Sequence, residues 1–468
     1  MRNKKFIFSM GVAALLFAAC SNDDNLVTGT GGGAAEPTIV EGEPTYASFT
    51  VKSGEVKNSR AATAPETGDD QITGDVTLLI FNYQTKVLEN KFTMTPTSGT
   101  ANGTFLVTSG KKRIYAFANL KTESGSTKIE ALQPKVSTVD EMLALVTDEA
   151  GTSLGQTATN VPMSNIDDGL AKDVANGVEQ TDAPTSNHID LKMLRMLSRA
   201  KLVLKSGVDA KFKASGFTAN NIAKVTYLVQ HAVGGVVKSP LYEKTWGSGI
   251  SVDDFMTKEA FYTGSTENTV NQLDQYYYLT ENTSPSFLKG AATHFILKGV
   301  YIPARIIRSG AFDVATQNLK FEYGGTPTED DCDEYCYVTE SPNAAVIPTG
   351  EFFLNRDILN DAIDAYNAAV TADKRITASE VKYNEYTTGS YYRINLGEGE
   401  AGATVFGVKR NNSYTVTVNS VTGPGFNTPD GTNGAEGDPS APIDQKTYLD
   451  VTVTVAPWVE VTQGSDIN

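Results

Sequence analysis

Cysteine and histidine are the side chains most often used for nucleophilic, metal-binding and redox chemistry, and this chain of 468 residues has only three of each. Two of the cysteines, Cys332 and Cys336, share one short acidic stretch. In an exported protein this spacing favours a local disulfide, with two free thiols as the alternative. A zinc site is disfavoured because two further ligands would have to come from distant parts of the chain.

The other residues with chemical potential form no recognisable constellation. His188, His231 and His294 are scattered, and none accompanies a serine or cysteine nucleophile in a known motif. Acidic clusters such as Glu329–Asp331 lack the spacing of a calcium-binding loop, so we expect solvated turns there. Both Arg195 and Arg199 are expected to be structural. We therefore predict that the protein is not an enzyme and uses neither a metal nor another cofactor.

The third cysteine, Cys20, follows an export signal. Basic residues precede the apolar run Phe6–Ala19, and small residues lead into the cysteine. This pattern predicts a secretory signal over residues 1–19, and the run is too short to span a membrane comfortably. Cys20 resembles the lipid-accepting cysteine of bacterial lipoproteins; the alternative is an incidental cysteine or an uncleaved anchor. Residues 21–44 are rich in glycine and polar residues, which is typical of a flexible tether.

The balance of charge excludes some partners. The chain has 39 basic and 55 acidic residues, which gives a formal net charge of −16 at pH 7. An acidic surface repels nucleic acid and gives no reason to expect binding to an anionic membrane. We therefore predict no nucleic-acid partner.

Most of the chain has the pattern of short β-strands. Strands separated by turn residues fall into two sets with few helices, which predicts two β-sandwich domains in tandem. We place them at residues 61–207 and 208–456, between a propeptide at 20–60 and a tail at 457–468. Helices are expected at Val139–Val146, capped by Thr138 with Glu141, and at Arg356–Val370, capped by Asn355. The stretch Ile189–Lys205 fits a helix or a strand, and we predict a strand.

Apolar and polar residues alternate at both ends of the mature chain. Near the beginning, Ala47, Phe49 and Val51 alternate with polar residues, and the connector after them leads to Arg60 and Ala61. If a protease cuts after Arg60, this strand can leave and open a groove in its sheet. The groove would then accept a strand from another chain.

The other end could supply that strand. A final strand from Leu449 to Val455 is predicted to close the last domain, and Pro457 interrupts its regular pairing. Trp458 follows, and then Val459, Val461 and Ile467 lie in a second alternating pattern. A strand that continues beyond a finished domain is suited to join a free sheet edge. We therefore predict that this tail fills the groove of a neighbouring copy.

Dispersed motifs over essentially the whole chain resemble those of Bacteroidales fimbrillins, and the end resembles that of the Mfa-type fimbrial shaft subunit. The motifs are, in order, the cysteine after the signal, Ser59–Ala61, Leu79–Asn82, Arg195–Lys201, Tyr277–Asn282, Arg410–Val418 and Leu449–Trp458. The resemblance implies two transthyretin-like domains and a surface lipoprotein precursor that is cut by an arginine-specific protease. It implies cleavage between Arg60 and Ala61 and strand donation from Trp458 onward.

The implied partners follow from the same resemblance. They are other copies of the chain in an adhesive fimbria, anchor and tip subunits, the outer membrane through the lipid before processing, and host or bacterial surface receptors. Two alternatives remain open. One is an anchor or tip subunit, and the other is a monomeric surface lipoprotein that binds glycans or host proteins through exposed aromatic residues such as Tyr276–Tyr278.

Overall fold

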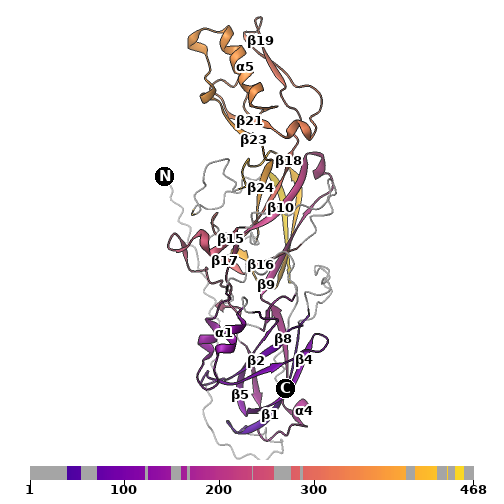
Figure 1. Cartoon of the computed structure of the whole chain (residues 1–468), viewed down its shortest axis with the longest axis vertical. Coiled ribbons are helices and arrows are strands. Elements are labelled where there is room, and N and C mark those ends of the chain that lie inside the picture. The colour runs from indigo at the N-terminus through magenta and orange to yellow at the C-terminus, as the bar shows by residue number, and fades with distance from the viewer. Residues whose placement is uncertain are drawn as a thin grey trace, which may run out of the picture. The chain divides into compact units, whose positions relative to one another are not determined.

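The computed structural model describes residues 39–53, 71–121, 125–148, 160–165, 169–233, 236–257, 276–284, 288–396, 406–429, 440 and 448–457. They form a mainly β structure with a few short helices (Figure 1), as the sequence predicts. None of the helices in these ranges is long and apolar enough to cross a membrane. The predicted lipidation site Cys20, the cleavage site Arg60–Ala61 and the tail from Trp458 to Ile467 lie outside the described residues.

The first part of the chain forms an eight-stranded sheet in the order β3-β2-β5-β6-β8-β1-β4, with β7 also paired to β5. Its strands are β1 (Pro44–Ser53), β2 (Val76–Asn82), β3 (Leu88–Met94), β4 (Thr100–Thr108), β5 (Gly110–Ala118), β6 (Met163–Ser164), β7 (Leu170–Val174) and β8 (His188–Arg195). Strand β2 is apolar on both faces because both faces of this sheet are covered by buried clusters. Short helices are α1 (Ser126–Ala131), α2 (Val139–Leu143) and α4 (Ala183–Ser186).

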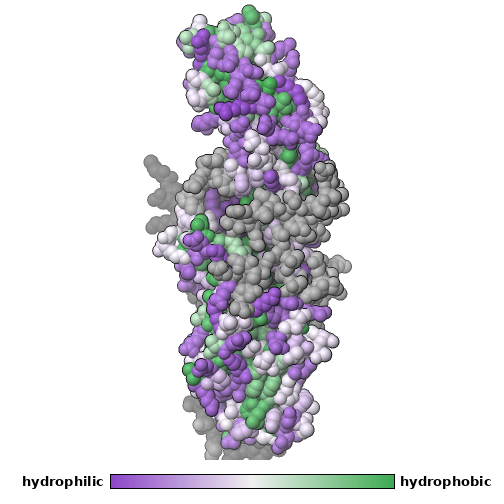
Figure 2. Space-filling view, in the orientation of Figure 1, coloured by the Kyte–Doolittle hydropathy of each residue, from purple (hydrophilic) through white to green (hydrophobic). Residues whose placement is uncertain are grey.

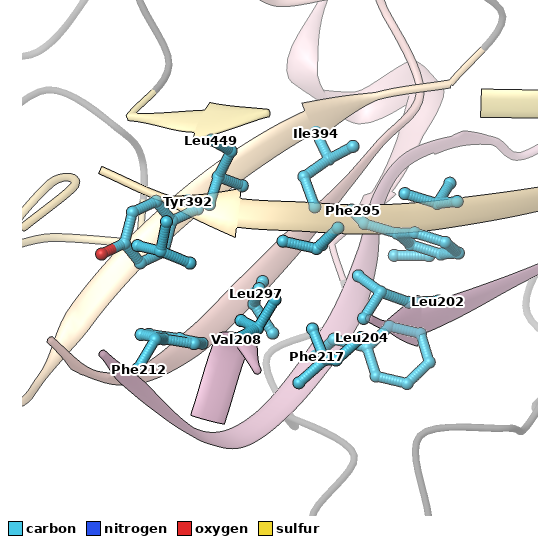
Figure 3. Close-up of a cluster of buried hydrophobic side chains, with 14 of the residues drawn as sticks. Leu202, Leu204, Val208, Phe212, Phe217, Phe295, Leu297, Tyr392, Ile394 and Leu449 are labelled. Atoms are coloured by element: carbon cyan, nitrogen blue, oxygen red, sulfur yellow. The ribbon is translucent and has the colours of Figure 1, made fainter. Parts of the chain in front are cut away.

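The next part forms two four-stranded sheets that contribute to one hydrophobic cluster (Figure 3). The first, in the order β16-β9-β26-β27, consists of β16 (Tyr277–Thr280), β9 (Leu197–Leu204), β26 (Asn412–Val421) and β27 (Leu449–Pro457). The second, in the order β15-β10-β18-β24, consists of β15 (Phe255–Thr257), β10 (Phe212–Ala223), β18 (His294–Tyr301) and β24 (Ser390–Asn395). Phe217 and Phe295 from the second sheet pack in an edge-to-face contact with centroids 5.1 Å apart.

Small two-stranded pairs and 3-10 helices connect these elements. The pairs are β11 (Ala232–Val233) with β12 (Val236–Val237), β13 (Thr245–Trp246) with β14 (Gly249–Ile250), and β17 (Asn282–Ser284) with β25 (Phe406–Val408). The 3-10 helices are Val208–Ala210, Val252–Asp254, Asp330–Cys332, Ala372–Lys374 and Ala378–Glu380.

The stretch expected as one strand over Ile189–Lys205 consists of two strands that break at Met196. The choice of strand over helix is confirmed. However, β8 pairs with β1 and β6 of the first sheet, whereas β9 pairs with β16 and β26. The buried apolar positions shift by one residue across the break, from Ile189, Leu191 and Met193 to Ala200, Leu202 and Leu204, and this shift accompanies the change of partner. We propose that the boundary between the two domains lies at Met196, before the predicted position at Gly207.

A segment with its own core is inserted between two paired strands. Strands β18 and β24 pair directly from His294 with Asn395 to Gly299 with Ser390, although residues 302–389 separate them in sequence. This inserted segment contains β19 (Ser309–Asp313), β20 (Asn318–Glu322), β21 (Tyr335–Glu340), β22 (Phe352–Phe353), β23 (Lys382–Tyr386) and α5 (Arg356–Ala369). Figure 1 draws it at one end of the picture, beyond β18 and β24. Its cluster includes Ile307, Val338, Phe353, Leu359 and Ile363.

Both predicted helix caps are confirmed. The backbone N–H of Thr138 donates to Glu141 at 2.8 Å, and the N–H of Glu141 donates to the Thr138 hydroxyl at 3.3 Å, which completes a capping box at α2. At α5, the Asn355 side chain accepts from the N–H of Ile358 at 3.0 Å. The helices end at Leu143 and Ala369, slightly before the predicted ends.

Candidate functional site

Strand β1, which contains the residues predicted to be displaced, lies in the interior of its sheet. It pairs antiparallel with β4 from Pro44–Thr108 to Lys52–Thr100. On its other side it pairs parallel with β8 from Ser48–His188 to Ser53–Met193. Both edges of its backbone are therefore hydrogen-bonded. Removing β1 would leave unpaired backbone groups on β4 and on β8.

One face of β1 supplies the centre of a hydrophobic cluster. Ala47, Phe49 and Val51 are buried, with at most 1% of each exposed. They pack with residues of β4 and β8, including Ala101, Val107, Ile189, Leu191 and Met193. The Phe49 ring lies 6.2 Å from the ring of Phe105 on β4, and Phe105 in turn stacks on Phe92 of β3 at 4.2 Å. β1 therefore fills a groove lined by apolar side chains of β4 and β8.

Polar contacts hold the first half of β1 to the loop between β7 and α4. The N–H of Tyr46 donates to the Val178 carbonyl at 3.1 Å. The Tyr46 carbonyl accepts from the side-chain amide of Asn187 at 2.9 Å. Thr45 adds its hydroxyl, which donates to the Ala175 carbonyl at 2.9 Å and accepts from the Val178 N–H at 3.0 Å. Neither Asn187 nor Thr45 was singled out from the sequence, because a lone asparagine before a strand carries no distinctive signal.

The chain before β1 is held by Ser109, which lies between β4 and β5. The N–H of Gly42 donates to the Ser109 carbonyl at 3.2 Å, and the N–H of Ser109 donates to the Glu43 carbonyl at 2.8 Å. The Ser109 hydroxyl accepts from the Glu43 N–H at 3.0 Å and donates to the Val40 carbonyl. The described hydrogen bonds from side chains are therefore concentrated at the beginning of β1, away from the predicted cleavage site.

The last strand, β27, forms where the sequence predicts it and pairs antiparallel with β26 from Leu449–Val421 to Pro457–Asn412. Leu449 is buried, and Val451 and Val453 pack partly against the main cluster, while Val455 is 48% exposed. The buried face predicted for this strand is therefore confirmed at its beginning and fades toward Pro457. The predicted donor residues follow directly after this point.

The predicted disulfide between Cys332 and Cys336 is not formed, and both residues are free, buried cysteines. Cys332 packs in the main cluster, whereas Cys336, on β21, packs in the cluster of the inserted segment. Because the two side chains serve different cores, their short spacing in sequence does not bring them together. Burial raises the pKa of each thiol to about 12. A thiol with so high a pKa is a poor nucleophile.

A buried ion pair that the sequence did not indicate lies in the second part of the chain, next to a contact with the first part. Nε of Arg410 donates to Glu281 at 3.1 Å, and the two side chains are 1% and 0% exposed. Arg410 also donates to the Thr226 hydroxyl at 3.0 Å and to the Tyr227 carbonyl at 2.7 Å. Thr226 in turn exchanges hydrogen bonds with Thr147 of the first part. Burial raises the pKa of Glu281, and the charge of Arg410 opposes this shift.

The other charged or titratable residues considered from the sequence are buried or bound to neighbouring groups. Arg195 and Arg199 are fully buried, and Arg199 lies 4.4 Å from the centre of the Tyr276 ring. His294 is buried, its Nδ1 lies 2.8 Å from the Ala292 carbonyl, and burial holds its pKa well below 6.5. Asp331 is not a solvated turn residue as expected, because it forms an ion pair with Arg308 at 2.7 Å, which lowers its pKa.

Two further observations bear on the alternatives. Tyr276, Tyr277 and Tyr278 are buried, so they do not form the exposed aromatic face that a glycan-binding lipoprotein would need. Within the described residues, no group of three or more histidine, cysteine or acidic side chains is placed to hold a metal ion. Where Figure 2 is coloured, hydrophilic residues predominate on the face shown, with a few apolar patches between them.

The first strand of the described structure is buried in its own sheet, and two family models match parts of the chain. Residues 45–195 match the model of the major fimbrial subunit protein (FimA). Residues 384–464 match the model of the major fimbrial subunit protein type IV, fimbrillin, C-terminal. The chain is therefore similar to fimbrillins over these two regions. No curated protein matches it.

Similar solved structures come from Porphyromonas gingivalis and Parabacteroides distasonis. A fimbrilin from Porphyromonas gingivalis is 18% identical, with 90% of this chain and 99% of that chain covered and a TM-score of 0.43. A proposed cell adhesion protein from Parabacteroides distasonis is 15% identical, with 90% and 100% covered and a TM-score of 0.46. The tip fimbrial protein Mfa3 from P. gingivalis, with a C-terminal truncation, is 12% identical, with 89% and 100% covered and a TM-score of 0.39.

Proposed function

We propose that the chain is a fimbrial shaft subunit that polymerises by strand exchange. A protease with arginine specificity hydrolyses the bond between Arg60 and Ala61, β1 leaves its sheet, and the tail of a neighbouring copy from Trp458 onward takes its place. One observation carries the proposal. The strand between β4 and β8 that completes the first core belongs to an N-terminal segment that a single cut after β1 detaches.

The energetics explain why cleavage is needed. Burying Phe49 and Val51 contributes about 1.5–3 kcal/mol each, and each backbone hydrogen bond contributes roughly 0.5–1.5 kcal/mol. In the uncut chain, β1 remains tethered at high local concentration and rebinds its groove. After the cut, a free strand lost from the groove is diluted, while an incoming strand restores the same backbone hydrogen bonds. The free energies of binding of the two strands are therefore similar, and the exchange is driven by dilution of the released N-terminal segment.

The remaining features of the precursor extend the proposal. A lipid on Cys20 would hold the precursor at the outer membrane until the cut releases residues 20–60 from the rest. The two parts of the described structure would be the two transthyretin-like domains of the family. Anchor and tip subunits would complete the fimbria, which would bind host or bacterial surface receptors.

The test compares chains that start at Ser21 and therefore lack the lipid. One preparation is cut after Arg60, a second is cut but ends at Pro457, and a third carries Arg60→Ala and stays uncut. Gel ladders of unheated samples and electron microscopy detect polymers. We expect ladders and filaments from the first preparation alone. Polymerisation of the cut chain that ends at Pro457, or monomers throughout, would refute strand donation by the tail.

A further inference from the structure

We infer that Asn187 and the loop around Ala175 and Val178 form a clamp that holds the backbone of whichever strand lies between β4 and β8. The clamp would position the incoming tail in the polymer as well as β1 in the precursor. This inference rests on the proposed strand exchange. It assigns a positioning role to residues that lie outside β1 and outside the tail.

The clamp contacts main-chain atoms of β1. The side-chain amide of Asn187 donates to the Tyr46 carbonyl at 2.9 Å, and the Asn187 carbonyl accepts from the N–H of Ser48 at 3.0 Å. The Val178 carbonyl accepts from the N–H of Tyr46 at 3.1 Å. These contacts continue the parallel pairing with β8, which begins at Ser48 and His188. The clamp therefore extends the pairing edge beyond the end of β8.

Asn187 is held in place without β1. Its side-chain amide also donates to the Ala175 carbonyl at 2.9 Å, and its side-chain oxygen accepts from the Ala175 N–H at 2.9 Å. Its own backbone N–H donates to the Ala183 carbonyl at the end of α4. The side chain is buried, with 3% of the residue exposed. Because Ala175 and Ala183 do not belong to β1, we expect Asn187 to keep its orientation after β1 leaves.

Recognition of main-chain atoms sets the specificity of the clamp. Any residue with a backbone N–H can occupy the positions of Tyr46 and Ser48, but proline cannot. Pro457 is therefore excluded from both positions, whereas the proposed incoming strand from Trp458 onward contains no proline. Parallel pairing with β8 also requires that this strand run in the same direction as β1. The clamp therefore contacts the strand through main-chain atoms and does not depend on its side chains.

The test measures how long a tail peptide stays bound. Chains ending at Pro457 are cut after Arg60, and a fluorescent peptide with the sequence of residues 458–468 is exchanged into the groove. We expect the peptide to dissociate about tenfold faster from Asn187→Ala than from the wild type, because one strand hydrogen bond and the support of the loop are lost. Asn187→Asp, which keeps the shape and the acceptor but loses the amide donor, should behave similarly and covers the case in which Asn187→Ala does not fold.

Asn165→Ala is the matched control. Asn165 is also a buried asparagine with two main-chain hydrogen bonds in the first sheet, to Ala116 and Ile114 at 2.9 Å, but these lie on β5. Its peptide dissociation rate should stay within about twofold of the wild type. Equal rates for the wild type and both Asn187 variants would overturn the clamp and leave strand exchange standing. A peptide that binds no cut chain at all would refute both proposals.

Discussion

Replacing Phe49 by alanine tests how strongly β1 is held in its groove. The ring is 1% exposed, packs against Phe105, and lies in the cluster formed by β1, β4 and β8. Truncation of a buried phenylalanine costs about 3–5 kcal/mol, because it removes apolar contacts and leaves a cavity. Each 1.4 kcal/mol corresponds to a factor of ten in an equilibrium constant. If the whole cost appears in the dissociation rate of the cut strand, its release accelerates by about 10²- to 4 × 10³-fold.

The assay follows the cut fragment. Chains ending at Pro457 are cut after Arg60, and the fraction of released N-terminal fragment is measured over time by size-exclusion chromatography and native mass spectrometry. Leu106→Ala is the control, since Leu106 lies opposite Tyr46 on β4 but is 52% exposed. It should leave the release rate nearly unchanged. Equal release rates for Phe49→Ala and the wild type would show that the apolar face of β1 does not hold it.

Three further predictions concern other contacts. Thr45→Val removes the two hydrogen bonds of the hydroxyl and should accelerate fragment release about tenfold or more in the same assay; an unchanged rate would contradict this role. Arg410→Met leaves Glu281 buried without its partner and should lower the free energy of unfolding, measured in urea, by about 3–5 kcal/mol. Adding Glu281→Gln should restore part of this stability. If it restores none, the loss does not come from the unpaired charge of Glu281. Below pH 6.5, His294 is protonated in the unfolded state but not in the folded state, so the free energy of unfolding should fall by up to about 1.4 kcal/mol per pH unit as the pH drops. The variant His294→Asn should show a smaller difference in unfolding free energy between pH 7.5 and pH 5 than the wild type. An equal difference in the two proteins would contradict this prediction.

The strands and helices that depend on local patterns could be predicted from the sequence. Period-two alternation placed β1 and β27, because each buries one face in a sheet. The caps at Thr138 and Asn355 identified the starts of α2 and α5, since a cap is formed by residues three positions apart. These features need no knowledge of the partner strand.

Features that depend on distant contacts could not be predicted in this way. The alternation shifts by one residue near Met196, but the strands that pair with β8 and with β9 lie far away in sequence, so the pattern does not identify them. Cys332 and Cys336 are neighbours in sequence but belong to different cores. The clamp at Asn187 depends on carbonyl and amide groups that the fold brings together from three segments, and no residue type in the sequence indicates such a site.

The inserted segment has a consequence for a polymer built from this chain. Its base packs on the neighbouring strands through Phe352 and Tyr301, whose ring centroids lie 5.9 Å apart, and the Tyr386 hydroxyl donates to the Gly425 carbonyl at 2.9 Å. Every copy in a filament would therefore present the same segment in the same orientation. A contact too weak to hold one subunit would be repeated along the filament, and simultaneous engagement can raise overall avidity by about 10²–10⁴-fold. Attachment strength would then depend on filament length.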